Sequence, residues 1–470
     1  MFKAKYCFPW ILSLALIGCV NVSQIDTKLQ EKATPDAWQN TSNYLKIEDD
    51  WLVQFKQAHL TNLVEEALVA NQTLRQQAFQ VEILEQQQIK SHASFWPDLD
   101  FTISSNRNHA ATTDTTSSRH TAKLESSYEI DLWGKLSDSQ KSTQLAWLTA
   151  KSQYQQQKQT LVANVTNTWF SLITARQLVK LSEQRVENAK QSLDIIESGY
   201  KQGVNKALDV YLSRNDLNTE VSNLASQKNN LIETARQLER LLGRYPSGKL
   251  TTLVSELSLP ELPAAIPLGM PSDIISRKPQ LQAAWNQVLA QDANLAFAHK
   301  SRFPSVKLTA SVSNTTTEIS DLLSSSAIGW SLLGNLTAPI FKAGELKADE
   351  EIARLRLKQQ EQAYLTTLYQ AFNQVESAIT NEASLTTRYT ATLAAEKNAL
   401  AAQTIAFEQY QRGLVSYTTV LNAQDRAFSA QSGLIQIKNQ LLSNRVNFHL
   451  ALGGDFEPSD ANQQEISPNE

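Results

Sequence analysis

The sequence predicts an α+β fold in which very long helices are joined to a few amphipathic strands. Two stretches, from Leu136 to Ser198 and between Gly344 and Arg412, contain neither proline nor glycine. Four other segments alternate apolar and polar residues, which indicates strands with one face of each kind. Both features occur twice along the chain. We therefore expect two copies of one unit that runs helix, two strands, long helix and shorter helix.

The amino terminus has the pattern of a removed signal peptide. Lys3 and Lys5 precede an apolar core that is shorter than the about 20 residues needed by a spanning helix. No later run of 18 apolar residues occurs either, so no helix is expected to cross a bilayer. We predict a signal peptide at residues 1–18.

The signal ends in a Leu-Ile-Gly-Cys sequence whose last residue is Cys19. This sequence resembles the bacterial lipobox, in which cleavage leaves a cysteine that carries acyl chains. We predict that Cys19 is lipidated and that residues 19–59 form a lipid-anchored segment. In such lipoproteins an aspartate after the cysteine favours the inner membrane, and Val20 stands there instead, so we expect the outer membrane. The alternative is an ordinary secretory signal with a chance cysteine.

Composition excludes several other classes of protein. The only other cysteine, Cys7, lies in the removed segment, so no disulfide can form within one chain. The net charge of −4 is small and dispersed, and gives no sign of nucleic-acid binding. The histidines lack metal-ligand spacing and no Gly-rich phosphate loop is present, so we predict no enzyme, cofactor or metal. The histidines are His59, His92, His109, His120, His299 and His449.

The duplication can be read from two matched motifs. Tyr-Lys-Gln-Gly-Val at 200–204 matches Tyr-Gln-Arg-Gly-Leu at 410–414, an offset of 210 residues. Phe-Trp-Pro at 95–97 matches Arg-Phe-Pro at 302–304, an offset of 207. The predicted segments are a first repeat at 60–243, an equatorial linker at 244–271, a second repeat at 272–453 and a polar tail at 454–470.

The long helices require a bundle. At 1.5 Å per residue the first spans about 90 Å and the second about 100 Å, and neither is stable alone. A first helix is expected from Leu60 to Phe95, where Pro97 stops it. One shorter helix has heptad spacing, which indicates either a coiled coil or an ordinary core stripe. The heptad residues are Leu217, Val221, Leu224, Leu231, Ala235, Leu238 and Leu242.

The strands are expected in two hairpins, at about 98–132 and 304–340. We expect a long polar loop from Asn106 to His120 at the apex of the first. Each strand has about ten residues, the length that a tilted membrane strand needs. Four strands cannot close a barrel, because the smallest membrane barrels have about eight. Three chains, each contributing four strands, would give about twelve strands around a polar lumen.

The duplicated hairpin and long-helix unit resembles the TolC-type outer-membrane efflux proteins, and the lipobox resembles that of their OprM-like (NodT-type) lipoprotein branch. The resemblance implies a homotrimer with a twelve-stranded transmembrane β-barrel continued by a helical coiled-coil barrel through the periplasm. It also implies a periplasmic adaptor protein and an inner-membrane RND-type pump as partners. The expected function is a passive duct that exports drugs or other small molecules. The alternatives are a duct for type I protein secretion and a coiled-coil scaffold lipoprotein.

The resemblance also indicates where the periplasmic end would close. The turn glycines are Gly203 and Gly413. The family motif at the second turn is matched in part, with Asn422 where an acidic residue is common. The residues that the resemblance implicates in the gate are Asp209, Tyr410, Arg412 and Asn422. For Asp209 the alternative is a simple helix N-cap.

Overall fold

The computed structural model describes residues 25, 29–38, 50–262, 270–322, 324 and 328–456. The predicted signal peptide and Cys19 lie outside these residues, as does the tail beyond residue 456. The chain divides into two compact units, and each contains parts of both repeats.

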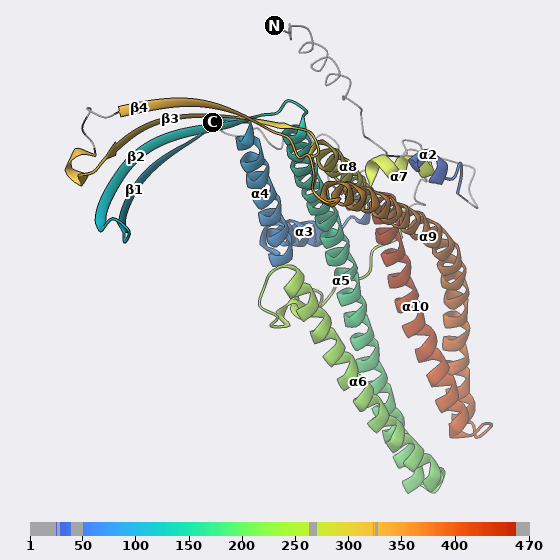
Figure 1. Cartoon of the computed structure of the whole chain (residues 1–470). Coiled ribbons are helices and arrows are strands. Elements are labelled where there is room, and N and C mark those ends of the chain that lie inside the picture. Colours follow the sequence, from blue (N-terminus) through green and yellow to red (C-terminus); the bar gives the residue numbers. More distant parts are fainter. Residues whose placement is uncertain are drawn as a thin grey trace. The chain divides into compact units, whose positions relative to one another are not determined.

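The first unit contains Phe79–Ser152 and Gln282–Thr366. Its centre is one antiparallel sheet with the order β1-β2-β3-β4, so β1 and β4 are open edges (Figure 1). The strands are β1 (Asp98–Ala110), β2 (Thr115–Ile130), β3 (Ser305–Thr316) and β4 (Ile328–Thr337).

The sheet has an apolar face over which no described part of the chain forms a layer. In the register Phe101 faces Leu124, and Val312 faces Trp330, so the apolar rows of neighbouring strands coincide. These side chains are exposed, and Trp330 has 81% of its surface accessible. The opposite face carries polar residues such as Thr102 and Lys123. The predicted alternation is therefore present, and none of the elements that the structure describes covers these apolar rows.

The predicted loop from Asn106 to His120 is wrong. Asn106 pairs with Arg119, and the ladder continues to the pair Ala110 and Thr115. Only residues 111–114 form the turn. The segment is polar on both faces, which hides the alternation, but its threonines and serines have the extended backbone of a strand.

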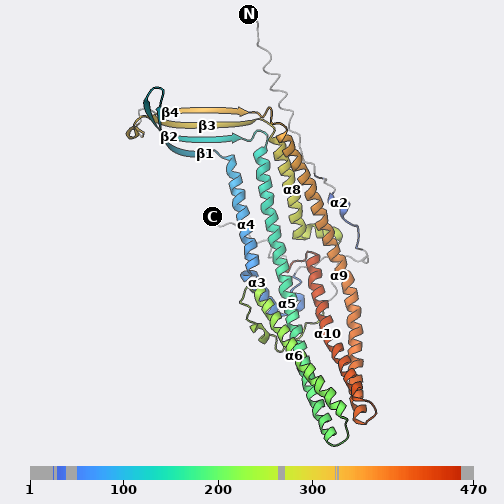
Figure 2. The same ribbon diagram turned by 60° about the horizontal axis from the view of Figure 1, so that its bottom comes forward.

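Four helices adjoin the sheet. They follow one another as α4, α5, α8 and α9, in the same order as the strands to which they are joined (Figure 2). Lys300, the last residue of α8, pairs with Asp138 of α5 at 2.6 Å, and Arg302 pairs with Glu350 of α9 at 2.6 Å. The outermost helices are thus α4 and α9. The bounds are α4 (Gln72–His92), α5 (Lys135–Lys201), α8 (Pro279–Lys300) and α9 (Glu345–Gln411).

The second unit consists mainly of two helical hairpins. Helix α5 pairs with α6 (Ala207–Leu241), and α9 with α10 (Tyr417–Ala451). Both long helices have 67 residues and both shorter ones have 35. Among the described residues, no helix combines the length and the apolarity that a membrane crossing requires. The remaining elements are α2 (Leu29–Ala33), α3 (Ala58–Ala70), α7 (Pro271–Arg277), and the 3-10 turns Val53–Phe55, Ala93–Phe95, Lys249–Thr252 and Ile319–Asp321.

The helix expected from Leu60 to Phe95 is broken at Asn71, between α3 and α4. Asn71 is extended; its Oδ1 accepts a hydrogen bond from the Leu74 N–H at 2.9 Å, and its Nδ2 donates to the Leu241 carbonyl. The second repeat has the same break at Lys278, 207 residues later, where Pro279 favours an extended backbone. The first break is thus marked by Asn71, whose side chain caps the start of α4.

The heptad stripe of α6 is only partly covered. Its carboxyl-terminal half, from Leu231 to Leu242, is buried in a core built around Trp169 and Phe170. Val221, in the other half, keeps 51% of its surface exposed. Leu224 packs against the same core and Leu217 is half-buried, so Val221 is the heptad residue that the described part of the chain leaves exposed.

Candidate functional site

Both helical hairpins end in the same turn. Val204 N–H donates to the Gly199 carbonyl at 2.8 Å, and Leu414 N–H donates to the Gln409 carbonyl at 2.9 Å. These bonds and those of the adjacent glycines form Schellman caps. Gly203 and Gly413 have φ of +77° and +73°, and a Cβ at either would meet no atom within 4 Å. Glycine is therefore required by the backbone rather than by space.

Next to the turns, side-chain hydrogen bonds of Tyr410 and Tyr417 join the two hairpins. Tyr410 Oη donates to Asp209 Oδ2 at 3.4 Å, and the Tyr410 ring lies 5.4 Å from that of Tyr417. A small apolar cluster that includes Val210 and Val420 surrounds these groups. Burial, and then the charge of Asp209, raise the pKa of Tyr410 to about 12, so its hydroxyl stays protonated and able to donate at physiological pH.

Of the four predicted gate residues, the structure brings Asp209 and Tyr410 together. The N-cap alternative for Asp209 is wrong, because the N-cap of α6 is Lys206 and Asp209 lies inside the first turn. The side chains of Arg412 and Asn422 are exposed and form no hydrogen bond or ion pair with another described residue of the chain.

A second connection between the hairpins was missed by the sequence analysis. Arg185 of α5 forms an ion pair with Glu220 of α6 at 2.9 Å and another with Asp425 of α10. Its guanidinium also lies 4.4 Å from the ring centroid of Phe428. We call these four residues the arginine cluster. Glu220 is only 2% exposed, so a buried carboxylate depends on this arginine.

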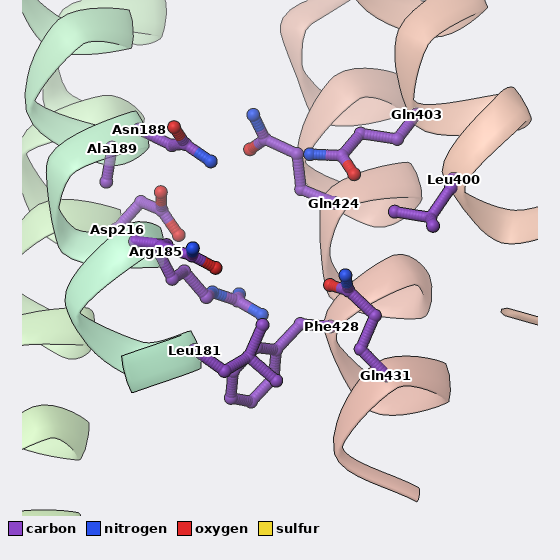
Figure 3. A pocket seen from close by; sticks show the side chains of 11 residues that line it. Leu181, Arg185, Asn188, Ala189, Asp216, Leu400, Gln403, Gln424, Phe428 and Gln431 are labelled. Atoms are coloured by element: carbon purple, nitrogen blue, oxygen red, sulfur yellow. The ribbon is translucent and has the colours of Figure 1, made fainter. Parts of the chain in front are cut away.

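The arginine cluster adjoins a polar cavity of about 150 Å³ (Figure 3). Gln403 and Gln424 line it from the second hairpin, and Asn188 and Asp216 from the first. Burial raises the pKa of Asp216, with Arg185 opposing the shift and the two neighbouring carboxylates adding to it. In the sequence, the arginine cluster could have been suspected from Glu220, a charged residue directly before the heptad position Val221.

The histidines and carboxylates that the structure describes are not grouped as metal ligands. Within the described ranges, no group of three or more His, Cys, Asp or Glu side chains is placed to hold a metal ion. His109 lies 3.2 Å from the Thr116 hydroxyl, while His120 faces Ser105 across the ladder, so the two histidines of the first hairpin do not meet.

An open four-stranded sheet with an uncovered apolar face, joined to long helical hairpins, defines a protomer of an outer-membrane channel. A model of the family described as "outer membrane efflux protein" matches residues 63–244 and 270–454. The chain belongs to this family, and it is an outer-membrane channel component of an efflux system.

Individual relatives span nearly the whole chain. Cation efflux system protein CusC of Escherichia coli (strain K12) is 26% identical over 457 residues, which cover 95% of this chain and 98% of the relative. Toluene efflux pump outer membrane protein TtgI of Pseudomonas putida is 28% identical over 414 residues, covering 86% and 87%. The solved outer-membrane channel OprN has a TM-score of 0.83 at 23% identity, covering 90% of this chain and 98% of its own, which shows a shared fold.

Proposed function

We propose that three copies of this chain form a passive duct that carries small molecules through the outer membrane. The observation that supports it best is the sheet, whose edges β1 and β4 are open and whose apolar face is uncovered. Open edges cannot face lipid, so the strands must pair between copies. Three sheets give about twelve strands, enough for an aqueous lumen lined by the polar face.

The proposed assembly includes a periplasmic adaptor protein and an inner-membrane RND-type pump. The named relatives belong to a cation efflux system and to a toluene efflux pump, so related channels serve different cargoes. This supports a duct that conducts what its pump selects and carries out no chemistry. Since these names refer to efflux, we favour efflux over protein secretion. Lipidation of Cys19 would add an anchor, and mass spectrometry of the mature amino terminus tests it.

The gate is proposed at the hairpin ends, where Tyr410 and Asp209 connect the two hairpins. Opening would separate the hairpins, which breaks this bond and the ion pairs of the arginine cluster. Three copies of Asp209 around one axis would place negative charge in a confined lumen, where cations are favoured over anions. In the trimer, Arg412 and Asn422 would complete the constriction.

Planar-bilayer recording of the purified protein tests duct and gate together. Tyr410→Phe combined with Arg412→Ser should raise conductance, since the hydrogen bond lost contributes about 0.5 to 1.5 kcal/mol. Asp209→Ala should reduce cation selectivity. The matched control is Tyr200→Phe, the equivalent position of the first repeat, whose side chain is exposed. Protein that runs as a folded monomer in detergent would refute the duct, whereas a conducting trimer insensitive to all these variants would refute only the gate.

A further inference from the structure

The loop that follows β3, at the end of the sheet away from the helices, folds back over one row of the sheet (Figure 1). Across the four strands this row consists of Ile103, Ala122, Asn314 and Ile328. It belongs to the apolar face, since Asn314 follows Val312 by two residues on β3. Ala122 and Asn314, on the middle strands, are 8% and 6% exposed, whereas Ile103 and Ile328, on the edge strands, stay exposed. The loop therefore covers the middle of the last apolar row.

Asn314 binds this loop through its side chain. Its Nδ2 donates to the carbonyls of Asp321, Leu322 and Ser324, at 3.3, 2.8 and 2.9 Å. Leu322 is itself buried. We call residues 318–322 together with Ser324 the strap. Burial of an amide is unfavourable unless it is hydrogen-bonded, so Asn314 and the strap stabilise each other on this face.

The strap also has donors for carbonyls that Asn314 does not reach alone. Thr316 Oγ1 donates to the Glu318 carbonyl at 2.8 Å, and Ser324 Oγ donates to the Asp321 carbonyl at 2.8 Å. A loop in water does not need such donors, because water supplies them, whereas backbone against lipid must find its partners within the protein. The exposed apolar side chain of the strap is Ile319, with 68% of its surface accessible. The strap is thus suited to contact with lipid.

We infer that the strap lies on the lipid-facing wall of the channel, and that Asn314 is the positioning residue that keeps it out of the pore mouth. This rests on the proposed duct, in which the polar face of the sheet lines the lumen. The strap covers the middle strands, so it stays clear of the edges β1 and β4 that pair between copies. The mouth is then bordered by β1 and β2, whose ladder continues to Ala110 and Thr115, beyond the end of β3 at Thr316.

Spin labelling of the full-length protein in liposomes tests the position of the strap. A label on Ile319→Cys should collide more with oxygen, which concentrates in the bilayer, than with a water-soluble nickel complex. Trp330→Cys on the apolar face gives the reference for lipid, and Ser311→Cys on the polar face gives the reference for the lumen. Cys7 is removed with the signal and Cys19 carries lipid in the proposed mature form, so neither competes for the label.

Replacing Asn314 tests its positioning role. Asn314→Leu keeps the size of the side chain but removes its three hydrogen bonds. In this background the label on Ile319→Cys should become more accessible to the nickel complex. Planar-bilayer recordings should show brief closures, as the freed strap enters the mouth. Asn108→Leu on β1 is the matched control, because its side chain is exposed, and it should change neither measurement.

The outcomes separate this inference from the proposed function. A conducting trimer in which the Ile319→Cys label is as accessible to nickel as the Ser311→Cys label would overturn the lipid-facing position. An Asn314→Leu channel that behaves like Asn108→Leu in both measurements would overturn the positioning role, and Asn314→Ala gives the same test if leucine prevents assembly. Unmodified protein that forms no conducting trimer would refute the proposed function itself.

Discussion

The two helical hairpins have the same helix lengths and the same turn, but they carry different side chains where they contact each other. Both consist of a 67-residue and a 35-residue helix, and both turn on a glycine with positive φ. Near its end the first hairpin carries carboxylates at Asp209, Asp216 and Glu220. The second carries the phenols of Tyr410 and Tyr417, with Asp425 as its only carboxylate in the arginine cluster.

This difference shows what duplication keeps and what it changes. Backbone caps are set by the chain itself, so both copies keep them. The turn tyrosine is kept as well, since Tyr200 is the counterpart of Tyr410, but at the same offset the counterpart of Asp209 is Thr419. The bond from Tyr410 of one hairpin to Asp209 of the other therefore has no equivalent from Tyr200 to a carboxylate at position 419. Divergence at 209 and 419 thus makes the contact between the two repeats asymmetric.

Removing Arg185 should have the largest effect. Arg185→Ala leaves Glu220 buried without a partner, which should cost about 3 to 5 kcal/mol. We expect a markedly lower midpoint of thermal unfolding, followed by circular dichroism in detergent. Arg388→Ala on α9 is the control, since that side chain is exposed. A midpoint for Arg185→Ala equal to that of Arg388→Ala would show that the arginine cluster does not hold the hairpins together.

Replacing either turn glycine with alanine should lower the stability of the protein by an intermediate amount, and the loss should be equal in the two hairpins. Gly203→Ala and Gly413→Ala each place a Cβ in left-handed backbone, which costs roughly 1 to 2 kcal/mol. No neighbouring atom adds to this cost. The same unfolding measurement should show similar shifts. A clearly larger loss in one variant would mean that its turn has contacts absent from the other.

Lowering the pH should have the smallest effect on stability, and this effect should come from Asp216 in the first hairpin. The pKa of Asp216 is raised, so the folded form takes up this proton at a higher pH than the unfolded chain does. This residue's contribution to stability therefore grows as pH falls through its folded pKa and diminishes as pH rises. Asp216→Asn should remove that part of the pH dependence, with Asn188→Asp as a contrast that adds a carboxylate to the same cavity. Identical pH profiles for Asp216→Asn and the unmodified protein would exclude the effect.

Sequence patterns predicted the parts of the fold that depend on local spacing. The long helices were placed within about three residues because helix breakers bound them. The four strands were found by alternation, and the first hairpin apex was misread because both its faces are polar. Asp209 and Tyr410 were singled out by the family resemblance at the repeated turn. Arg185 was not, because its partners lie 35 and 240 residues further along the chain and only packing brings them together.

The connections from sheet to long helix differ between the repeats. Four residues, 131–134, join β2 to α5, and seven, 338–344, join β4 to α9. Asp131 ties down the first connection by accepting hydrogen bonds from the Leu136 and Ser137 N–H groups. In the second, Ile340 and Phe341 are almost fully exposed. Length has thus already changed at 338–344 without altering the length of the helix that follows, so the spacing between strand and long helix is not fixed by the residue count of this connection.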